Sequence, residues 1–532
     1  MSGRGRRLVA ALLLGLTFAL VAFPLLARPG GGQTYSGSSS SSSSSSSGSS
    51  RSGSSSGWSS SGSGSSGSSG GGDLGGLIVL LFENPPLGVA VIFLIGAYVF
   101  FVRNREGSGQ ARDWTSAEPR RWDAGAEKLR ERMEEAGAQL EQSRIKGKRQ
   151  SEMRAAIEGI SEHDPNFSVV LFEDFVVALF AEAHVHRGRG TLAELGPWIS
   201  GDAHQALAEL GTRQEVSGIV VGAMRYVAIE GLRDGDSIRV QVEIESNYSE
   251  GAEQRWYSVD RWLLARRKGV RSKPKDKTRV FECPSCGAPL EALRGRECSY
   301  CKKTVAGGDF DWEVREIRNV TRQARPPGLG GHAPEMGTEL PTVVDPAAKG
   351  RWEALCRRDP AVTWPAFLAR LDLTFKRLQE SWNGQDLALA RPFVSDGVYQ
   401  SFAYWIDAYQ RQRLRNYTEG ARILSVQMAR VTGDAVYDSV TVRVFATGYD
   451  FTLDGEGTVV GGSRDQERRY SEYWTLIRGA GQRGAPRTDP SCPSCGAPLE
   501  IAMTGHCKHC RVKVTSGDFD WVLSRIEQDE SY

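Results

Sequence analysis

Eight of the nine cysteines fall into two sets with the same spacing, which constrains the fold more than any other feature. Each set is a pair of C-x-x-C units separated by eleven residues. The sets are Cys283, Cys286, Cys298 and Cys301, and Cys492, Cys495, Cys507 and Cys510. Four thiolates at this separation complete a tetrahedral Zn²⁺ site without an open coordination position. We therefore predict two structural zinc sites, each in a small zinc ribbon.

Residues beside the cysteines support zinc rather than disulfide bonds, the alternative use of these thiols. Gly287 and Gly496 follow the second cysteine of each set, where a tight turn needs positive φ. Basic residues that would offset the negative charge of a zinc ion with four thiolates are Lys302, Lys303, Lys508, Arg511 and Lys513. We interpret His506 and His509 as surface residues, and the lone Cys356 as a small apolar residue.

Other short motifs recur around the two cysteine sets in the same order. Asp164-Pro165 comes before the first set, and Asp359-Pro360 before the second. The sequence Gly-Asp-Phe-Asp-Trp follows each set, at residues 308–312 and 517–521. This order predicts two copies of one unit of roughly 150 residues.

Hydrophobic periodicity predicts helices first and strands later in each copy. Apolar residues at three- and four-residue spacing predict helices at 167–180 and 367–382, with Thr363 as an N-cap. A second helix is expected after each, at 200–210 and 395–414. Alternating apolar and polar residues at 238–245 and 440–444 predict antiparallel strands. The fold class is therefore α+β, with helices on one face of a curved antiparallel sheet and a ribbon after it.

The N-terminal part of the chain has a different composition. Residues 36–72 are all Ser or Gly except Arg51 and Trp58. Such a segment buries no apolar surface, so residues 31–76 are expected to be a disordered leash. Residues 1–30 contain basic residues and then an apolar run, which fits either a cleaved signal peptide or a first transmembrane segment.

A second apolar stretch, residues 77–103, predicts a transmembrane helix, with a buried core helix as the alternative. Arg103 and Arg105 end this stretch, and basic residues stay on the cytoplasmic side of a membrane. We therefore expect a single-pass or double-pass protein whose folded domains are cytoplasmic. Residues 104–160 are charged and helix-prone, and indicate a juxtamembrane helical linker.

A basic run precedes the first cysteine set. It consists of Arg266, Arg267, Lys268, Arg271, Lys273, Lys275, Lys277 and Arg279. One interpretation is a solvated linker, and the other is contact with anionic lipid headgroups, which attract each nearby basic residue. The Pro- and Gly-rich residues 318–350 are interpreted as the linker between the copies.

Several of these features resemble the Tim forty-four-like (Tim44-like) domain. They are the motif Asp164-Pro165-Asn166-Phe167, the helix after it, the helices beginning at Ser200 and Ser395, and the strands that follow. That family is named after a subunit of the mitochondrial inner-membrane import machinery. The resemblance covers about residues 160–268 and 359–479, and the whole chain is similar to bacterial membrane proteins that carry this domain. It implies two cones of the nuclear-transport-factor-two-like fold.

With this resemblance, the expected domains are 161–279 and 351–488, followed by ribbons at 280–317 and 489–532. The resemblance also implies a non-enzymatic adaptor at the bacterial inner membrane, with a protein, peptide or lipid partner and a role in protein translocation.

Two further function classes stay open. A small-molecule sensor or enzyme would need polar groups that converge inside a cone, and the nearest catalytic candidates are Asp174, His184, His186 and His204. We expect both histidines of the long helix at a solvated helix end. Nucleic-acid or protein binding through the ribbons is the other class. The net charge of 66 − 64 = +2 argues against nucleic acid, because such domains are strongly basic.

Overall fold

The computed structural model describes residues 147–532, apart from 212–213, 253, 306, 325–328, 330–336 and 530. The predicted signal peptide or first span, the leash and the transmembrane helix lie outside the described residues. So does most of the juxtamembrane helix, of which residues 147–158 are described and helical. Among the described helices, none combines the length and the apolar character that a membrane crossing requires.

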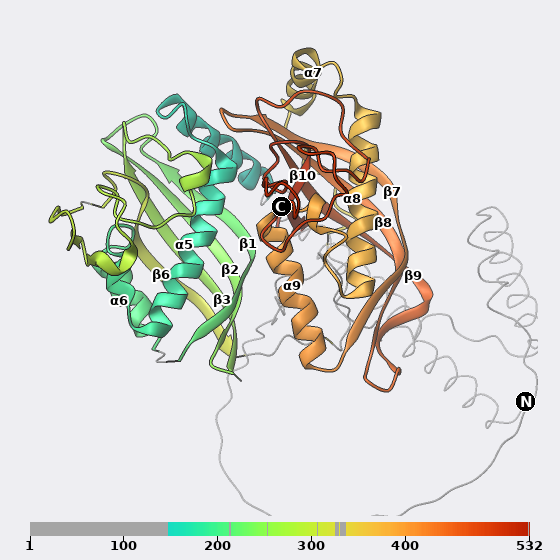
Figure 1. Cartoon of the computed structure of the whole chain (residues 1–532), viewed down its shortest axis with the longest axis horizontal. Helices are drawn as coiled ribbons and strands as arrows, with labels where there is room; N and C mark the ends of the chain where they lie inside the picture. The colour runs from blue at the N-terminus through green and yellow to red at the C-terminus, as the bar shows by residue number, and fades with distance from the viewer. Residues whose placement is uncertain are drawn as a thin grey trace, which may run out of the picture. The chain divides into compact units, whose positions relative to one another are not determined.

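The first domain is an antiparallel sheet with helices on one face (Figure 1). Its helices are α5 (Val169–Arg189) and α6 (Gly201–Glu209), with short 3-10 turns at Gly159–Glu162 and Leu192–Leu195. Its strands are β1 (Val216–Glu230), β2 (Ser237–Glu250), β3 (Gln254–Arg267) and β6 (Glu313–Ala324). They are ordered β1-β2-β3-β6. Side chains from the long helix and the sheet meet in one core, where Phe180 lies 5.2 Å from Trp262 between ring centroids.

The second domain has the same order of elements. Its helices are α7 (Ala348–Arg358), α8 (Trp364–Gly384) and α9 (Asp396–Arg411), with a 3-10 turn at Arg391–Phe393. Its strands are β7 (Arg415–Gly433), β8 (Tyr437–Leu453), β9 (Val459–Gly479) and β10 (Val522–Gln528). They form an antiparallel sheet in the order β10-β9-β8-β7. The predicted α+β class with antiparallel sheets is confirmed.

Local sequence explains where these elements begin and which face they bury. The Thr363 hydroxyl accepts a hydrogen bond from the backbone N–H of Ala366, so Thr363 is the N-cap of α8, as predicted. The apolar positions of this helix form one buried face. In β8, Val440, Val442 and Val444 are buried on one face, and Thr441 and Arg443 between them are buried on the other, so both faces of this strand are covered.

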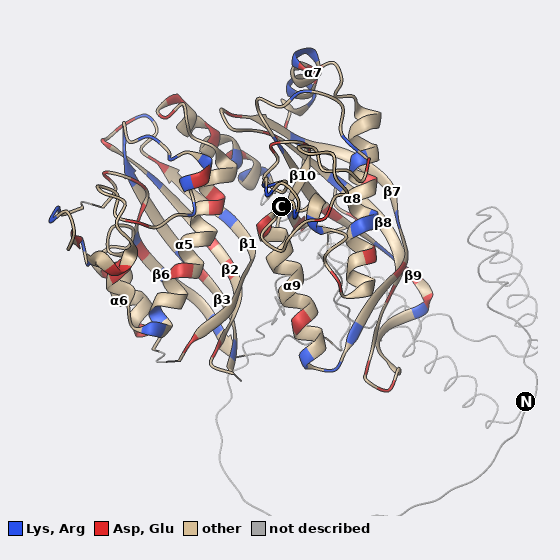
Figure 2. Ribbon diagram, viewed as in Figure 1, with Lys and Arg blue, Asp and Glu red and all other residues tan. Residues whose placement is uncertain are grey.

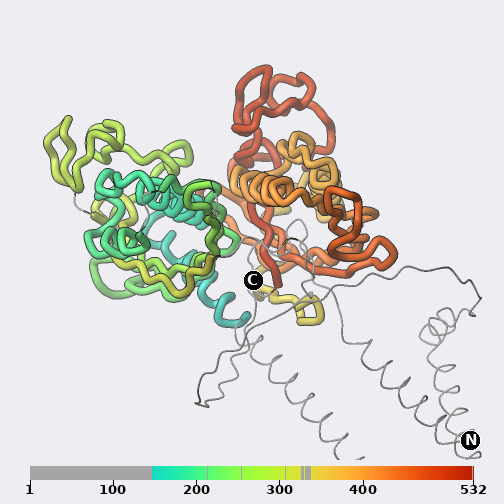
Figure 3. The backbone as a smooth tube through the Cα atoms, turned by 90° about the horizontal axis from the view of Figure 1, so that it is seen from below, coloured from blue at the N-terminus to red at the C-terminus, as the bar shows by residue number. Residues whose placement is uncertain are grey.

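Each ribbon is inserted into its sheet rather than appended to it. The first ribbon lies between β3 and β6, and β6 returns to pair with β3 through Trp262 and Ile317. A 3-10 turn at Lys275–Lys277 precedes the ribbon, which itself holds a 3-10 turn at Leu290–Ala292 and a hairpin of β4 (Leu293–Arg294) and β5 (Glu297–Cys298). The second ribbon lies between β9 and β10 in the same way, and Figure 3 shows this segment in red projecting from its domain.

This insertion corrects two predicted boundaries. The boundary between 317 and 318 cuts through β6, so residues 318–324 are strand and not linker. The segment 489–532 contains β10 as well as a ribbon. Sequence periodicity misses both strands because register shifts in their pairing break the two-residue alternation of buried and exposed residues.

Candidate zinc centres and the basic connector

The four sulfur atoms of each cysteine set converge on one point. Within each set, all ligand atoms lie within 4.8 Å of one another. The Sγ–Sγ distances are 3.9 Å for Cys283 and Cys301, and 3.8 Å for Cys286 and Cys298. Cys492 and Cys510 are 3.9 Å apart. A tetrahedral zinc with Zn–S bonds of about 2.3 Å requires sulfurs about 3.8 Å apart, so both sets fit Zn²⁺.

Tight turns hold the sulfurs in this arrangement. Gly287 and Gly496 have φ of 71° and 73°, and their N–H groups donate to the carbonyl oxygens of Cys283 and Cys492. The second turn of each ribbon places a non-glycine residue at positive φ, Lys302 in the first and Arg511 in the second. The predicted role of the two glycines is confirmed, whereas the sequence gives no signal for the strain at Lys302 and Arg511.

Backbone N–H groups aimed at the sulfurs favour the thiolate form that a metal needs. The N–H groups of Cys301 and Tyr300 donate to Cys298 and, against the opposing effect of burial, lower the pKa of this thiol to about 7. The N–H of Val512 does the same for Cys510, whose pKa is also lowered to about 7. The convergence of the four sulfurs, rather than the pKa of any one thiol, fits each set to one Zn²⁺ with four cysteine ligands and no open coordination position.

The basic run at residues 266–279, here called the basic connector, is largely neutralised by nearby carboxylates. Arg266 is 2% exposed, and its guanidinium lies 2.9 Å from Asp164. Ser272 donates to the same carboxylate through its N–H and its hydroxyl. Burial would raise the pKa of Asp164, but the Ser272 hydroxyl and the Arg266 charge outweigh it and lower that pKa. The predicted lipid contact is therefore wrong for Arg266, which holds the Asp-Pro motif to the end of β3.

The rest of the connector has similar partners. Carboxylates lie within ion-pair distance of Arg267, Lys273, Lys275, Lys277 and Arg279, namely Asp309, Asp311, Asp518, Glu282 and Asp174 in that order. Arg271 donates to the carbonyl oxygen of His163, and Lys268 is half-buried. Acidic and basic residues are likewise interspersed in the view of Figure 2. Lipid contact by the other seven residues stays a prediction, but six of the eight basic residues already face a carboxylate.

The predicted solvent exposure of the α5 histidines is wrong. His184 is 0% exposed and His186 is 6% exposed, because α5 is buried on nearly all sides. The His184 Nδ1 atom lies 3.2 Å from the guanidinium of Arg187, which pairs with Glu250 at 2.7 Å. Burial and the Arg187 charge lower the pKa of His184 well below its usual range, so its imidazole is neutral.

The remaining residues considered from the sequence lie in several different places. Within the described part of the chain, no hydrogen bond joins any two of Asp174, His184, His186 and His204. The lone Cys356 packs against the core of the second domain. In the second ribbon, His506 contacts the Thr504 hydroxyl at 3.1 Å, and His509 is exposed.

Comparison with known proteins identifies part of the second half of the chain. A family model described as the Tim44-like domain matches residues 349–487. The match runs from α7 to beyond β9 and ends before Cys492. No curated protein matches the chain.

Proposed function

We propose that the chain is a membrane-anchored, non-enzymatic scaffold with two Tim44-like domains of the cone-shaped nuclear-transport-factor-two-like fold. In this proposal the domains bind a protein, peptide or lipid at the cytoplasmic face of a bacterial inner membrane, with a role in protein translocation. The observation that carries it is the family match over residues 349–487. The membrane anchor rests on the apolar segment 77–103 of the sequence.

The assignment of the first domain to the same family, by duplication, rests on a shared set of contacts. In the first domain, Asp164 pairs with Arg266, and Arg266 lies 4.7 Å from the ring of Trp312. In the second, Asp359 pairs with Arg478 at 3.0 Å, and Arg478 lies 5.1 Å from the ring of Trp521. Each trio joins the Asp-Pro motif, the third strand and the segment after the ribbon.

The interior of the second domain supports binding rather than catalysis. Aromatic rings fill the space between helices and sheet, where Trp382 contacts Phe402 and Tyr409, and Phe375 contacts Trp474. All five side chains are at most 3% exposed. An enzyme or small-molecule sensor would need an open cavity in this interior, with a few polar groups that converge on the ligand.

Polar groups that enter this interior bond to one another. The indole N–H of Trp382 donates to Asn416 at 2.8 Å, and the Asn416 amide donates to Asp450 at 2.9 Å. The Thr418 hydroxyl donates to Gln379 at 2.5 Å. Because these groups are already paired inside the domain, the partner is expected on the outer surface.

The outer strand β7 is the part of that surface that we assign to the partner. Among the described residues, no strand pairs with its outer edge. Leu424, in the middle of this strand, is 50% exposed. An edge of this kind can accept an extended segment of a partner as an added strand.

Photo-crosslinking in intact membranes tests the proposal. A photoreactive residue at Leu424 is expected to give discrete protein or peptide adducts, whereas one at Leu389, which is 49% exposed outside the sheet, is expected to give far fewer. Mass spectrometry of the adducts identifies the partner. Equal adduct patterns at both positions, or no adducts at either, would reject β7 as a binding site. Adducts with lipid alone would reject a protein partner there.

A further inference from the structure

The two ribbons are joined to their domains in different ways. In the first ribbon, Cys283, Cys298 and Leu293 belong to the same buried cluster as the side chains of α5 and β2. In the second ribbon, Cys492 and Cys507 form a separate cluster, completed by Ile501 and Val514. The first ribbon therefore shares the core of its domain, and the second has a small core of its own.

Apolar and backbone contacts fix the first ribbon. The ring of Phe281 lies 5.9 Å from that of Phe175 in α5 and 5.3 Å from that of Trp198. The N–H of Gly295 donates to the carbonyl oxygen of Ala193 at 3.0 Å. The chains approach so closely that a Cβ on Gly196 would lie 2.2 Å from the Gly295 oxygen. Unfolding this ribbon would open the core of the first domain.

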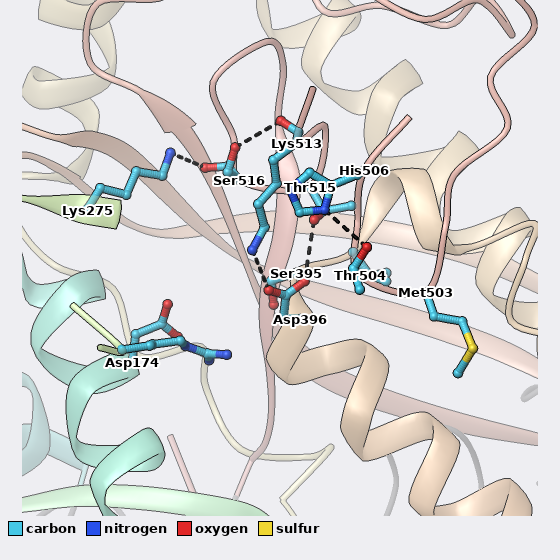
Figure 4. Close-up of polar contacts among 12 residues, drawn as sticks. Asp174, Lys275, Ser395, Asp396, Met503, Thr504, His506, Lys513, Thr515 and Ser516 are labelled. Carbon is cyan, nitrogen blue, oxygen red and sulfur yellow. Dashed lines mark hydrogen bonds and ion pairs between the residues drawn. The ribbon is translucent and has the colours of Figure 1, made fainter. Parts of the chain in front are cut away.

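A polar cluster around Asp396 connects the second ribbon to α9. The Asp396 carboxylate lies 2.7 Å from the Lys513 ammonium and accepts a hydrogen bond from Thr515, both from the ribbon (Figure 4). On its other side it pairs with Arg391, which is 2% exposed and donates to the carbonyl oxygen of Met503 in the ribbon. Burial would raise the pKa of Asp396, but Lys513 and Arg391 outweigh it and lower that pKa, so the carboxylate is charged at neutral pH.

The strand after the second ribbon is held independently of it. Trp521, Leu523 and Ile526 are all at most 5% exposed and belong to the core of the second domain. If the ribbon unfolds, β9 and β10 stay connected by a longer flexible loop. The entropic cost of such a loop grows only slowly with its length.

We infer that the second ribbon is a zinc-dependent module that detaches from its domain at the Asp396 cluster while the domain stays folded, and that the first ribbon cannot detach in this way. Loss of metal then has opposite consequences in the two halves. In the second half it releases a tethered segment, residues 489–516. In the first half it opens the domain itself. This inference does not rest on the proposed scaffold function.

Hydrogen–deuterium exchange of the zinc-loaded full-length chain tests the Asp396 contact. The Asp396→Asn variant is expected to exchange about tenfold faster in peptides from 489–516, because the negative charge that pairs with Lys513 is lost and the remaining hydrogen bonds are weaker. Peptides from the first ribbon are expected to keep the wild-type rate. The Lys513→Gln variant removes the contact from the ribbon side, at a residue 41% exposed, and leaves the pair of Asp396 with the buried Arg391 intact. This variant is expected to speed exchange in 489–516 while β8 and β9 keep the wild-type rate.

A matched control is Asp202→Asn, which removes an exposed carboxylate from the first turn of α6. It is expected to leave exchange in both ribbons unchanged.

Chelation until no zinc remains is the second part of the experiment. It is expected to raise exchange in 489–516 without changing β8 and β9, and to raise exchange in 283–301 together with α5 and β2. Parallel unfolding of both domains on chelation, or wild-type exchange in both Asp396→Asn and Lys513→Gln, would overturn the inference.

Discussion

Replacing Arg478 with methionine is expected to lower the free energy of unfolding of the second domain by about 3–5 kcal/mol. The side chains of Arg478 and Asp359 are 1% and 4% exposed, and the guanidinium lies 3.0 Å from the carboxylate. The variant leaves the buried Asp359 carboxylate without its cation, which costs more than the pair itself contributes. Urea unfolding of the full-length chain, followed by hydrogen exchange in peptides of β8 and β9, measures the loss in this domain.

An exposed pair provides the control for this substitution. Arg422 and Glu467 form an ion pair on the surface of the same sheet, and their side chains are 54% and 32% exposed. Because water screens such a pair, Arg422→Met is expected to change stability little. Addition of Asp359→Asn to the Arg478→Met variant removes the unpaired charge and is expected to restore part of the loss. Similar losses for Arg422→Met and Arg478→Met would contradict a structural role for the buried pair.

Replacing Trp312 with alanine is expected to destabilise the first domain by about 3–5 kcal/mol, the usual cost of removing a large core side chain. Trp312 is 3% exposed, and its ring lies 4.9 Å from that of Phe172 and 4.7 Å below the Arg266 guanidinium. The variant therefore leaves a cavity beside a buried ion pair. The loss is measured as the urea dependence of hydrogen exchange in peptides of α5 and β2.

Phe310 lies two residues earlier in the same motif and is 42% exposed. Phe310→Ala is the matched control and is expected to cost far less, because it removes little buried area. If both alanine variants destabilised the first domain equally, the segment after the ribbon would not be part of the core as described.

Short-range patterns predicted the helices α5, α6, α8 and α9 and the strands β2 and β8. The N-cap of α8 at Thr363 and its buried apolar face depend on residues within a few positions of one another. The cysteine sets were predictable for the same reason, since each spans fewer than twenty residues and carries its own turn glycine. These features do not need knowledge of distant contacts.

Contacts between distant residues were not predictable in the same way. Arg266 was placed in a solvent-facing basic run, yet its partner Asp164 lies 102 residues away. The exposure of His184 and His186 was also wrongly predicted, because the end of α5 is covered by β2 and its neighbours. The sequence holds a partial signal, since Asp, Arg and Trp occur in the same order in both halves of the chain. Their order alone does not show that the three side chains contact one another.

The family match confirms the Tim44-like prediction only for the second domain, over residues 349–487. The interiors of the two domains hold different polar groups, which are His184, Arg187 and Glu250 in the first and Gln379, Trp382 and Asp450 in the second. The order of helices and strands is nevertheless the same in both domains.

The zinc content of the protein is the most direct test of whether the eight cysteines form two metal sites. Both the ribbon structure and the inferred difference between the two ribbons depend on these sites. Metal analysis of the purified full-length chain is expected to find two zinc ions per chain. Cys298→Ser and Cys507→Ser each remove one buried ligand from one set, and each variant is expected to retain one zinc ion. A chain without bound zinc, or with the same zinc content in both serine variants as in the wild type, would contradict the two sites.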